Sequence, residues 1–586
     1  MNAGETAARR AQVERWFFPV LVGLWLLGVV VWTHADLWQK PGLLGAAQTD
    51  VVRGVWGLQH QAGSVPGIPF WTEFSGFPEG VKIVILPMLS SVMGVPLLWI
   101  FGPLNGYSLW VLLLLWAAGL AAAVLARAVT GQTSAGFVAG TAMVAQPMMF
   151  LALTDGTPEN VAFWALPLTL AVLWRAREEV RPSLGLLAGV LGTAVAFDSP
   201  YHAVFLLPFL LIVVPFTPWR VLLAELGAGV VGGILLLILY YGIPLKAPTA
   251  SLEGNALHLS VWRQYELQSV PDRWDYTLSA SFIPVAFLLA AGALSVLRPV
   301  RATPWLLVGL LALALGLGPG RGENPGVLGE VLGARGRQVG EWIASFNEQY
   351  PVPVVRFPRR WVLPAALAFA IAAELGLSRF PLRWLRGVLG LGLAVGMVWQ
   401  VDRLVWYRRD LPVLDPPQPE FAKFVREHEL DGAIIILPTS RAALRPHGRH
   451  ELPVFANIGS SITSGADSWV HALCGRPAVN RPTGLVTMVP RRTPNPEFDK
   501  IVRDLDDLTL PQTVSREIPP SATQEPARRA GVARQLVELG LRFLVIDEQI
   551  YGEEGLKMVK LPFDGMILED RHFDDGTGAT VVVLGE

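Results

Sequence analysis

Long apolar segments separated by short polar loops occupy the first 402 residues of the chain. Windows long enough to cross about 30 Å of hydrocarbon predict eleven membrane spans, at roughly 17–33, 107–126, 134–153, 160–174, 183–198, 202–216, 220–243, 280–297, 303–318, 361–377 and 385–402. A further half-apolar run at 81–102 contains Lys82, Pro87 and Pro96. Proline frees backbone groups that lipid cannot satisfy. We therefore expect this run to lie along, or re-enter, the membrane surface instead of spanning it.

The distribution of arginine supports this topology. With eleven spans and a cytoplasmic N-terminus, the cytoplasmic loops carry Arg127, Arg175, Arg177, Arg181, Arg220, Arg298, Arg301, Arg379, Arg383 and Arg386, as the positive-inside rule requires. The short loops on the other face, TDGTPEN and DSPYH, contain no Lys or Arg. We therefore expect the long loop at 34–106, and everything after residue 403, to lie outside the cytoplasm.

The hydrophobic pattern changes near residue 403. Apolar runs shorten to strand length, as in GAIIILP, FLVID and ATVVVLG, and they are separated by helical patterns at PEFAKFVREHEL and ARRAGVARQLVELG. This alternation predicts an extracytoplasmic α/β domain over 403–586, after a transmembrane domain over 1–402. The interval 490–528, rich in Pro, Arg, Thr and Asp, is expected to be loop.

Composition narrows the class of protein. The chain is 52% hydrophobic and only 16% charged, with a mean hydropathy of +0.43, which indicates an integral membrane protein. A net charge of -1 argues against a nucleic-acid partner, because a phosphate-binding surface needs a local excess of basic residues. The single cysteine, Cys474, cannot form an intrachain disulfide.

Acidic side chains mark the loops expected outside the cytoplasm. Asp50 lies in the long first loop, where a carboxylate can act as a general base or help hold a divalent ion on a phosphate leaving group. Asp155 and Glu159 lie in the next loop, and Asp198 and His202 flank the tip of the third. Each also has a structural interpretation, as a solvated loop residue, a helix-start acid or a turn residue. We expect these groups to converge on one cavity.

Three arginines, Arg356, Arg359 and Arg360, precede the tenth span on the face where the positive-inside rule does not explain them. Arginine forks at headgroup level suit a lipid phosphate or pyrophosphate, and the alternative is ordinary interfacial snorkelling. Glu374, near the opposite end of that span, is interpreted as a structural partner of Arg379.

Several stretches carry a family resemblance: TDVVRGVWGL in the first loop, the SGFPEG turn, FGPLNGYSL before the next span, and VVRFPRRWVLPAALAFAIAAELGL. Together with one span, a long loop, many spans and an outer C-terminal domain, they resemble the GT-C superfamily of polytopic glycosyltransferases, and in particular bacterial YfhO-like and related membrane proteins. The resemblance implies sugar transfer from a polyprenyl-phosphate-linked donor, outside the bacterial cytoplasmic membrane. It also implies that Asp50 is the catalytic first-loop acid.

On this basis Asp50 would activate a hydroxyl of a glycan, lipid or protein acceptor, and the arginines at 356–360 would hold the leaving lipid phosphate. Asp155, Glu159, Asp198 and His202 would bind the sugar. No second acidic residue adjoins Asp50. A divalent metal cofactor is therefore left as an open alternative. A rival function is a transporter or scaffold that binds lipid-linked glycans in envelope polysaccharide assembly without transferring them.

Overall fold

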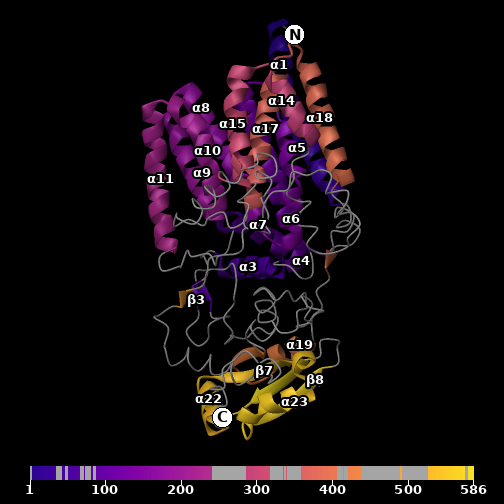
Figure 1. Cartoon of the computed structure of the whole chain (residues 1–586), viewed down its shortest axis with the longest axis vertical. Helices are drawn as coiled ribbons and strands as arrows, with labels where there is room; N and C mark the ends of the chain where they lie inside the picture. Colours follow the sequence, from indigo (N-terminus) through magenta and orange to yellow (C-terminus); the bar gives the residue numbers. More distant parts are fainter. Residues whose placement is uncertain are drawn as a thin grey trace.

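The computed structural model of the 586-residue chain is a tall bundle of helices with a small sheet beyond one end (Figure 1). It describes residues 3–34, 42–45, 51–65, 71–72, 81–82, 87–240, 285–316, 334–335, 338, 358–404, 413–414, 420–437, 489–490, 526–573 and 579–585.

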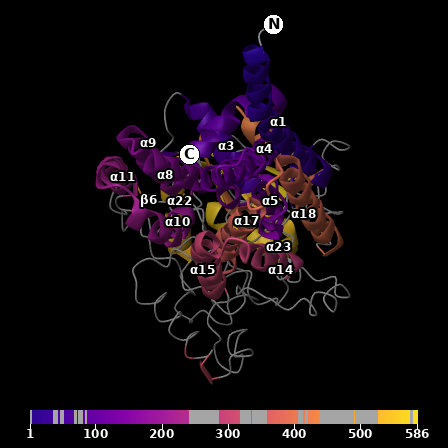
Figure 2. The same cartoon turned by 90° about the horizontal axis from the view of Figure 1, so that it is seen from above.

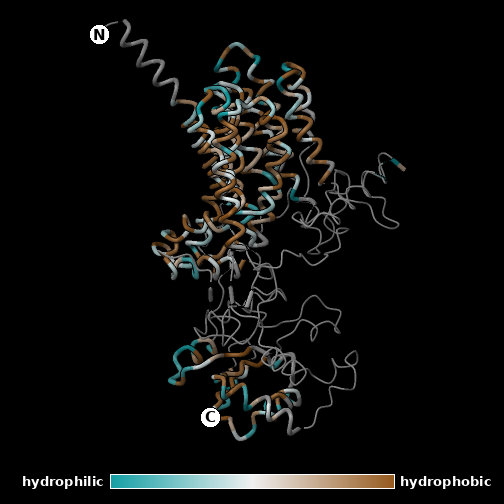
Figure 3. The backbone as a smooth tube through the Cα atoms, turned by 90° about the vertical axis from the view of Figure 1, so that its left-hand side faces the viewer, coloured by the Kyte–Doolittle hydropathy of each residue, from teal (hydrophilic) through white to brown (hydrophobic). Residues whose placement is uncertain are grey.

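Apolar helices build the bundle, and hydrophobic residues dominate it along its whole height (Figure 3). The helices are α1 (Ala3–Thr33), α3 (Val51–Ser64), α4 (Met88–Thr130), α5 (Phe137–Val144), α6 (Pro147–Asp155), α7 (Pro158–Val161), α8 (Ala165–Glu179), α9 (Pro182–Asp198), α10 (Pro200–Val213), η1 (Val214–Phe216), α11 (Trp219–Tyr240), α14 (Val285–Ser295), α15 (Pro299–Gly316), η3 (Pro358–Trp361), α17 (Val362–Leu377) and α18 (Arg383–Leu404). Among the described residues, three helices, α1, α4 and α11, are by length and composition able to cross a membrane alone. The chain is a membrane protein, and the count of eleven spans stays a prediction.

The half-apolar run at 81–102 is not a straight span. Gly102 has φ 76° and ψ 172° inside α4, and the Nε1 of Trp110 donates to the carbonyl of Ser90, 20 residues earlier, at 2.7 Å. The chain therefore folds back at Gly102. The arm from Met88 to Gly102 is about 21 Å long at 1.5 Å per residue, too short to cross about 30 Å, and it lies near α3 at the end of the bundle closest to the sheet (Figure 1).

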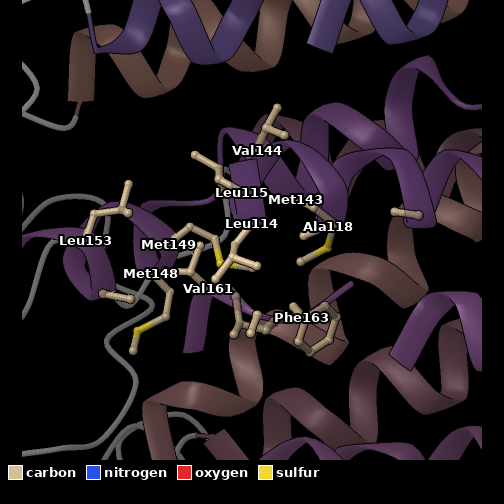
Figure 4. Packing of buried hydrophobic residues seen from close by; sticks show 14 of the residues in the cluster. Leu114, Leu115, Ala118, Met143, Val144, Met148, Met149, Leu153, Val161 and Phe163 are labelled. Carbon is tan, nitrogen blue, oxygen red and sulfur yellow. The ribbon is translucent and has the colours of Figure 1, made fainter. Parts of the chain in front are cut away.

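The sequence predicts one membrane span at 134–153. This prediction is wrong if the span is taken as one continuous helix. It contains α5 and α6, separated at Gln146, whose backbone is extended with φ -70° and ψ 124°. Pro147, which follows, has no N–H to continue a helical ladder but fits the first turn of a new helix. The methionines around this break pack with α4 and α7 in the core of the bundle, where Figure 4 shows Met143 and Met149 close to Leu114.

The C-terminal part contains a four-stranded mixed sheet in the order β5-β7-β9-β8, in which β5 and β7 are parallel and the other pairs antiparallel. Its elements are α19 (Glu420–Glu427), β5 (Ala433–Leu437), α22 (Pro526–Glu538), β7 (Leu541–Asp547), α23 (Glu548–Lys560), η9 (Leu561–Phe563), β8 (Ile567–Phe573) and β9 (Ala579–Leu584). The three strands and two helices predicted from the sequence are confirmed. Strand β8 was not predicted, because its sequence ILEDRHF is mostly exposed and polar.

Short strands join the first loop to the chain beyond residue 403. Strand β1 (Leu43–Leu44) pairs with β4 (Val413–Leu414), and β3 (Val81–Lys82) pairs with both β2 (Trp71–Thr72) and β6 (Val489–Pro490). Both segments of the first loop therefore hydrogen-bond with segments from the C-terminal part. The boundary predicted at 402/403 is consequently bridged by backbone pairing.

Candidate functional site

Asp198, at the end of α9, is fully buried and its carboxylate holds the start of α4. One oxygen accepts the backbone N–H groups of Leu89 at 2.8 Å and Ser90 at 2.9 Å, and the other accepts the Ser90 hydroxyl at 2.5 Å. The first N–H groups of a helix lack intrahelical acceptors. Asp198 therefore caps the α4 arm from a different helix, and the indole of Trp164 donates to the same Ser90 hydroxyl at 2.8 Å.

A chain of contacts connects this cap to α3. The indole of Trp110, bonded to the Ser90 carbonyl, packs edge-on against Tyr107 with ring centroids 5.7 Å apart. The Tyr107 hydroxyl lies 2.6 Å from where a Cβ on Gly54 would be, so only glycine lets α3 approach it. Asp50 lies outside the described residues, and α3 begins with the residue that follows it.

Arg360 and His202 lie together at the neighbouring helix ends. The Arg360 guanidinium lies over the ring of Tyr201, 4.3 Å from its centroid, and is close enough to act electrostatically on His202. The His202 ring hydrogen-bonds to the backbone of Ala162 and meets Phe163 edge-on at 4.9 Å. Arg360 and His202 are 3% and 1% exposed. A cation and an imidazole are thus fixed side by side by α10, η3 and the segment after α7.

Of the predicted site residues, His202 and Arg360 lie together. Asp198 lies four residues before His202, where α9 ends and α10 begins. Glu159 is also buried, in the four-residue helix α7. Asp155 ends α6 and Arg359 lies in η3, but the side chains of both are outside the described part, as is all of Arg356. The predicted convergence of these groups on one cavity stays a prediction.

In this arrangement both Asp198 oxygens are engaged by the α4 arm, not open to a sugar hydroxyl as the sequence led us to expect. Among the described residues, no group of three or more His, Cys, Asp or Glu side chains could hold a metal ion. The described geometry provides a fixed cation, a buried imidazole and a carboxylate that positions a helix.

Ser90, Trp110, Trp164 and Tyr201 were not singled out from the sequence. Ser90 is the third residue of α4, after an N-cap at Pro87, and not at the N-cap position where serine marks a helix start. For the three aromatic residues the sequence offers no signal, since Trp164 and Tyr201 contact residues of other elements and Trp110 reaches Ser90 only because α4 folds back at Gly102.

A second buried carboxylate, Glu374 in α17, caps the start of another helix at the opposite end of the bundle, as Asp198 caps the start of α4. It accepts the backbone N–H groups of Gly136 at 2.8 Å and Val138 at 3.0 Å, at the start of α5. Its charged neighbour is Arg127. The predicted pairing with Arg379 is wrong, because Arg379 is exposed while Glu374 is buried against α5 and α4.

No protein-family model matches the sequence, and no curated protein matches it. Across nearly its whole length the chain is structurally similar to GT-C glycosyltransferases. It matches the arabinofuranosyltransferase AftD from Mycobacteria at 15% identity with a TM-score of 0.56, over 97% of this chain and 40% of that one. It also matches the Archaeoglobus fulgidus oligosaccharyltransferase at 10% identity (TM-score 0.47, 94% of this chain and 72% of that one). ArnT from Cupriavidus metallidurans matches at 11% identity (TM-score 0.46, 96% and 97%). The chain thus spans about two-fifths of AftD, and the likeness to AftD shows that the fold is GT-C-like.

Proposed function

We propose that this protein is a membrane glycosyltransferase that moves a sugar from a polyprenyl-phosphate-linked donor to a glycan, lipid or protein acceptor on the outer face of the bacterial cytoplasmic membrane. The observation that carries the proposal is the GT-C-like fold, which covers 97% of the chain in the match to a glycosyltransferase, AftD. The C-terminal part would lie outside the cytoplasm and help select the acceptor. Its strand pairing with the first loop supports that role.

In the proposed reaction Asp50 takes the proton of the acceptor hydroxyl. The acceptor oxygen then forms a bond to the anomeric carbon while the bond from that carbon to the phosphate oxygen breaks, and the electron pair leaves with the lipid phosphate. The placement of α3 supports this assignment. Val51, the residue after Asp50, is buried, and α3 packs on α4, which is connected through Ser90 to Asp198.

We assign Arg360, with Arg356 and Arg359, to the phosphate that leaves. A guanidinium held in place over an aromatic ring is a fixed positive charge, and fixed charges stabilise developing negative charge without first having to reorganise. Asp155, Glu159 and His202 stay assigned to the sugar. Asp198 is assigned instead to positioning the α4 arm.

The test uses the full-length protein in nanodiscs with a radiolabelled polyprenyl-phosphate sugar, measuring donor binding and label transfer to acceptor separately. The proposal expects both, with donor consumed only when acceptor is present. A scaffold or transporter for lipid-linked glycans would bind the donor without turnover. That outcome would reject the glycosyltransferase hypothesis in favour of the scaffold or transporter. Alkaline phosphatase fused to the C-terminus is active only outside the cytoplasm, so its activity in cells that express the fusion tests on which side of the membrane the C-terminal part lies.

A further inference from the structure

Three arginines, which we call the arginine trio, gather at the end of the bundle opposite α3. They are Arg298 in the turn between α14 and α15, Arg383 at the start of α18, and Arg386 three residues further along α18. Among the described residues, the charged groups that act on Arg386 are the other two arginines, and both repel it. Like charges that repel one another raise the free energy of the cluster, and a bound anion would lower it.

Arg386 is the buried member of the trio. Its side chain is only 8% exposed, and one Nη atom donates to the carbonyl of Phe380 at 2.9 Å. Its Nε is buried with no hydrogen-bond partner. A buried donor on a charged group is costly to leave unsatisfied. The guanidinium therefore has donor capacity to spare, and the other two arginines lie close enough to act on it electrostatically.

Two helices begin at this place, and that adds to the positive potential. Arg298 accepts the backbone N–H of Ala302 at 3.0 Å, in the first turn of α15, and Arg386 lies in the first turn of α18. A helix N-terminus carries a partial positive charge that favours anions and disfavours cations. Basic side chains at two helix starts are thus arranged as they would be around a bound anion.

Exposed apolar side chains flank the trio. Val296 is 73% exposed and Val300 is 87% exposed, on either side of Arg298, and Trp384, between Arg383 and Arg386, is 61% exposed. A rim of this kind suits acyl chains and does not suit a free ion in water. We propose that the arginine trio binds the phosphate headgroup of an anionic phospholipid, whose chains lie along this rim, as basic pockets between membrane helices do.

Ordinary surface arginines of the same face provide the contrast. Arg181 is well exposed and forms an ion pair with Glu179 at 3.1 Å, so it needs no further anion. It carries the same charge as Arg386 on the same side of the bundle, and Arg181→Ala is therefore the matched control.

The experiment measures phospholipid binding to the detergent-purified full-length protein by native mass spectrometry. We expect phosphatidylglycerol to bind in preference to phosphatidylcholine, Arg386→Gln to weaken phosphatidylglycerol binding about ten-fold or more, and Arg181→Ala to leave it unchanged. Equal effects of the two variants, or equal binding of the two lipids, would overturn the proposal. Displacement of the lipid by an equal concentration of inorganic phosphate would assign the site to the free ion and would also overturn it.

Arg298→Ala keeps the proposal testable if Arg386→Gln does not fold. Arg298 is half-buried and lies in a turn, so its loss should leave the bundle intact. A several-fold loss of phosphatidylglycerol binding, with an unchanged melting temperature in lipid-free detergent, supports the trio. Unchanged binding in Arg298→Ala, with the protein folded, contradicts it.

Discussion

Asp198 and Ser90, 108 residues apart in the chain, are joined by two hydrogen bonds, one from the Ser90 backbone and one from its hydroxyl at 2.5 Å. The pair fixes the α4 arm to the junction of α9 and α10. Because Tyr201 and His202 follow directly in α10, the position of the arm and that of the Arg360 region are set by the same short segment.

We expect Asp198→Asn to destabilise the protein by about 1–3 kcal/mol, because an amide cannot accept hydrogen bonds at both of its atoms and the buried Ser90 donors lose a partner. Ser90→Ala should have a smaller effect, since the backbone bonds survive. The measurement is thermal unfolding in detergent of both single variants and the double variant. Their effects should be clearly non-additive, because the residues share one interaction.

The matched control for that cycle is Ser91→Ala. Ser91 is also buried, but its hydroxyl donates within its own helix, to the carbonyl of Met88 at 2.7 Å. The change should therefore be additive with Asp198→Asn. Additive behaviour of Ser90→Ala and Asp198→Asn would show that the bond between the Ser90 hydroxyl and Asp198 contributes nothing to stability.

We expect Arg360→Gln to weaken binding of the polyprenyl-phosphate donor about ten-fold, because a charge-assisted contact to phosphate is lost. Tyr201→Phe should leave donor binding nearly unchanged, since the ring and not the hydroxyl faces the guanidinium. Tyr201→Leu removes the ring and should weaken donor binding, but less than Arg360→Gln does. Donor binding in nanodiscs checks all three. Tight donor binding by a folded Arg360→Gln protein would remove Arg360 from the phosphate site.

Helix α9 packs on α11 through glycine, and this predicts a sharp difference between two positions three residues apart. A Cβ on Gly189 would lie 2.4 Å from the carbonyl oxygen of Glu225, whereas one on Gly192 would lie no closer than 3.8 Å to Thr169. Gly189→Ala should therefore destabilise the protein by about 1–3 kcal/mol. Gly192→Ala should be tolerated. Equal melting temperatures of the Gly189→Ala and Gly192→Ala variants would contradict this prediction, because they would mean that α9 can move away from α11 at no cost.

We expect Asp50→Asn to lower the rate of sugar transfer about 10²- to 10⁴-fold, because the variant keeps the shape of the side chain but cannot take a proton. Donor binding should survive, since the phosphate is assigned to the arginines. Asp36→Asn, in the same loop, is the control and should be nearly silent. Turnover of Asp50→Asn equal to that of the wild type would exclude Asp50 as the base.

Local patterns account for what could be predicted. The strands at 433–437, 541–547 and 579–584 follow from short apolar runs with Gly at their ends, and the prolines of 81–102 indicated that this run does not span the membrane. Strand β8 escaped prediction because only its partner β9, with all six residues buried, makes it a strand. Pairing of six β8 residues with residues of β9 outweighs the polar composition of β8.

The sequence by itself determined that this is a membrane protein with apolar helices, a long first loop and a C-terminal α/β part, because each of these depends on periodicity and length within one segment. The tertiary structure alone decided the partners of the buried charges. Asp198 caps the start of α4, Glu374 caps the start of α5, and Arg386 lies near Arg298 of the α14–α15 turn. A buried charge must find its partner wherever packing brings one, and in a bundle of antiparallel helices that partner lies on a neighbour in space, more than a hundred residues away in the chain for both carboxylates.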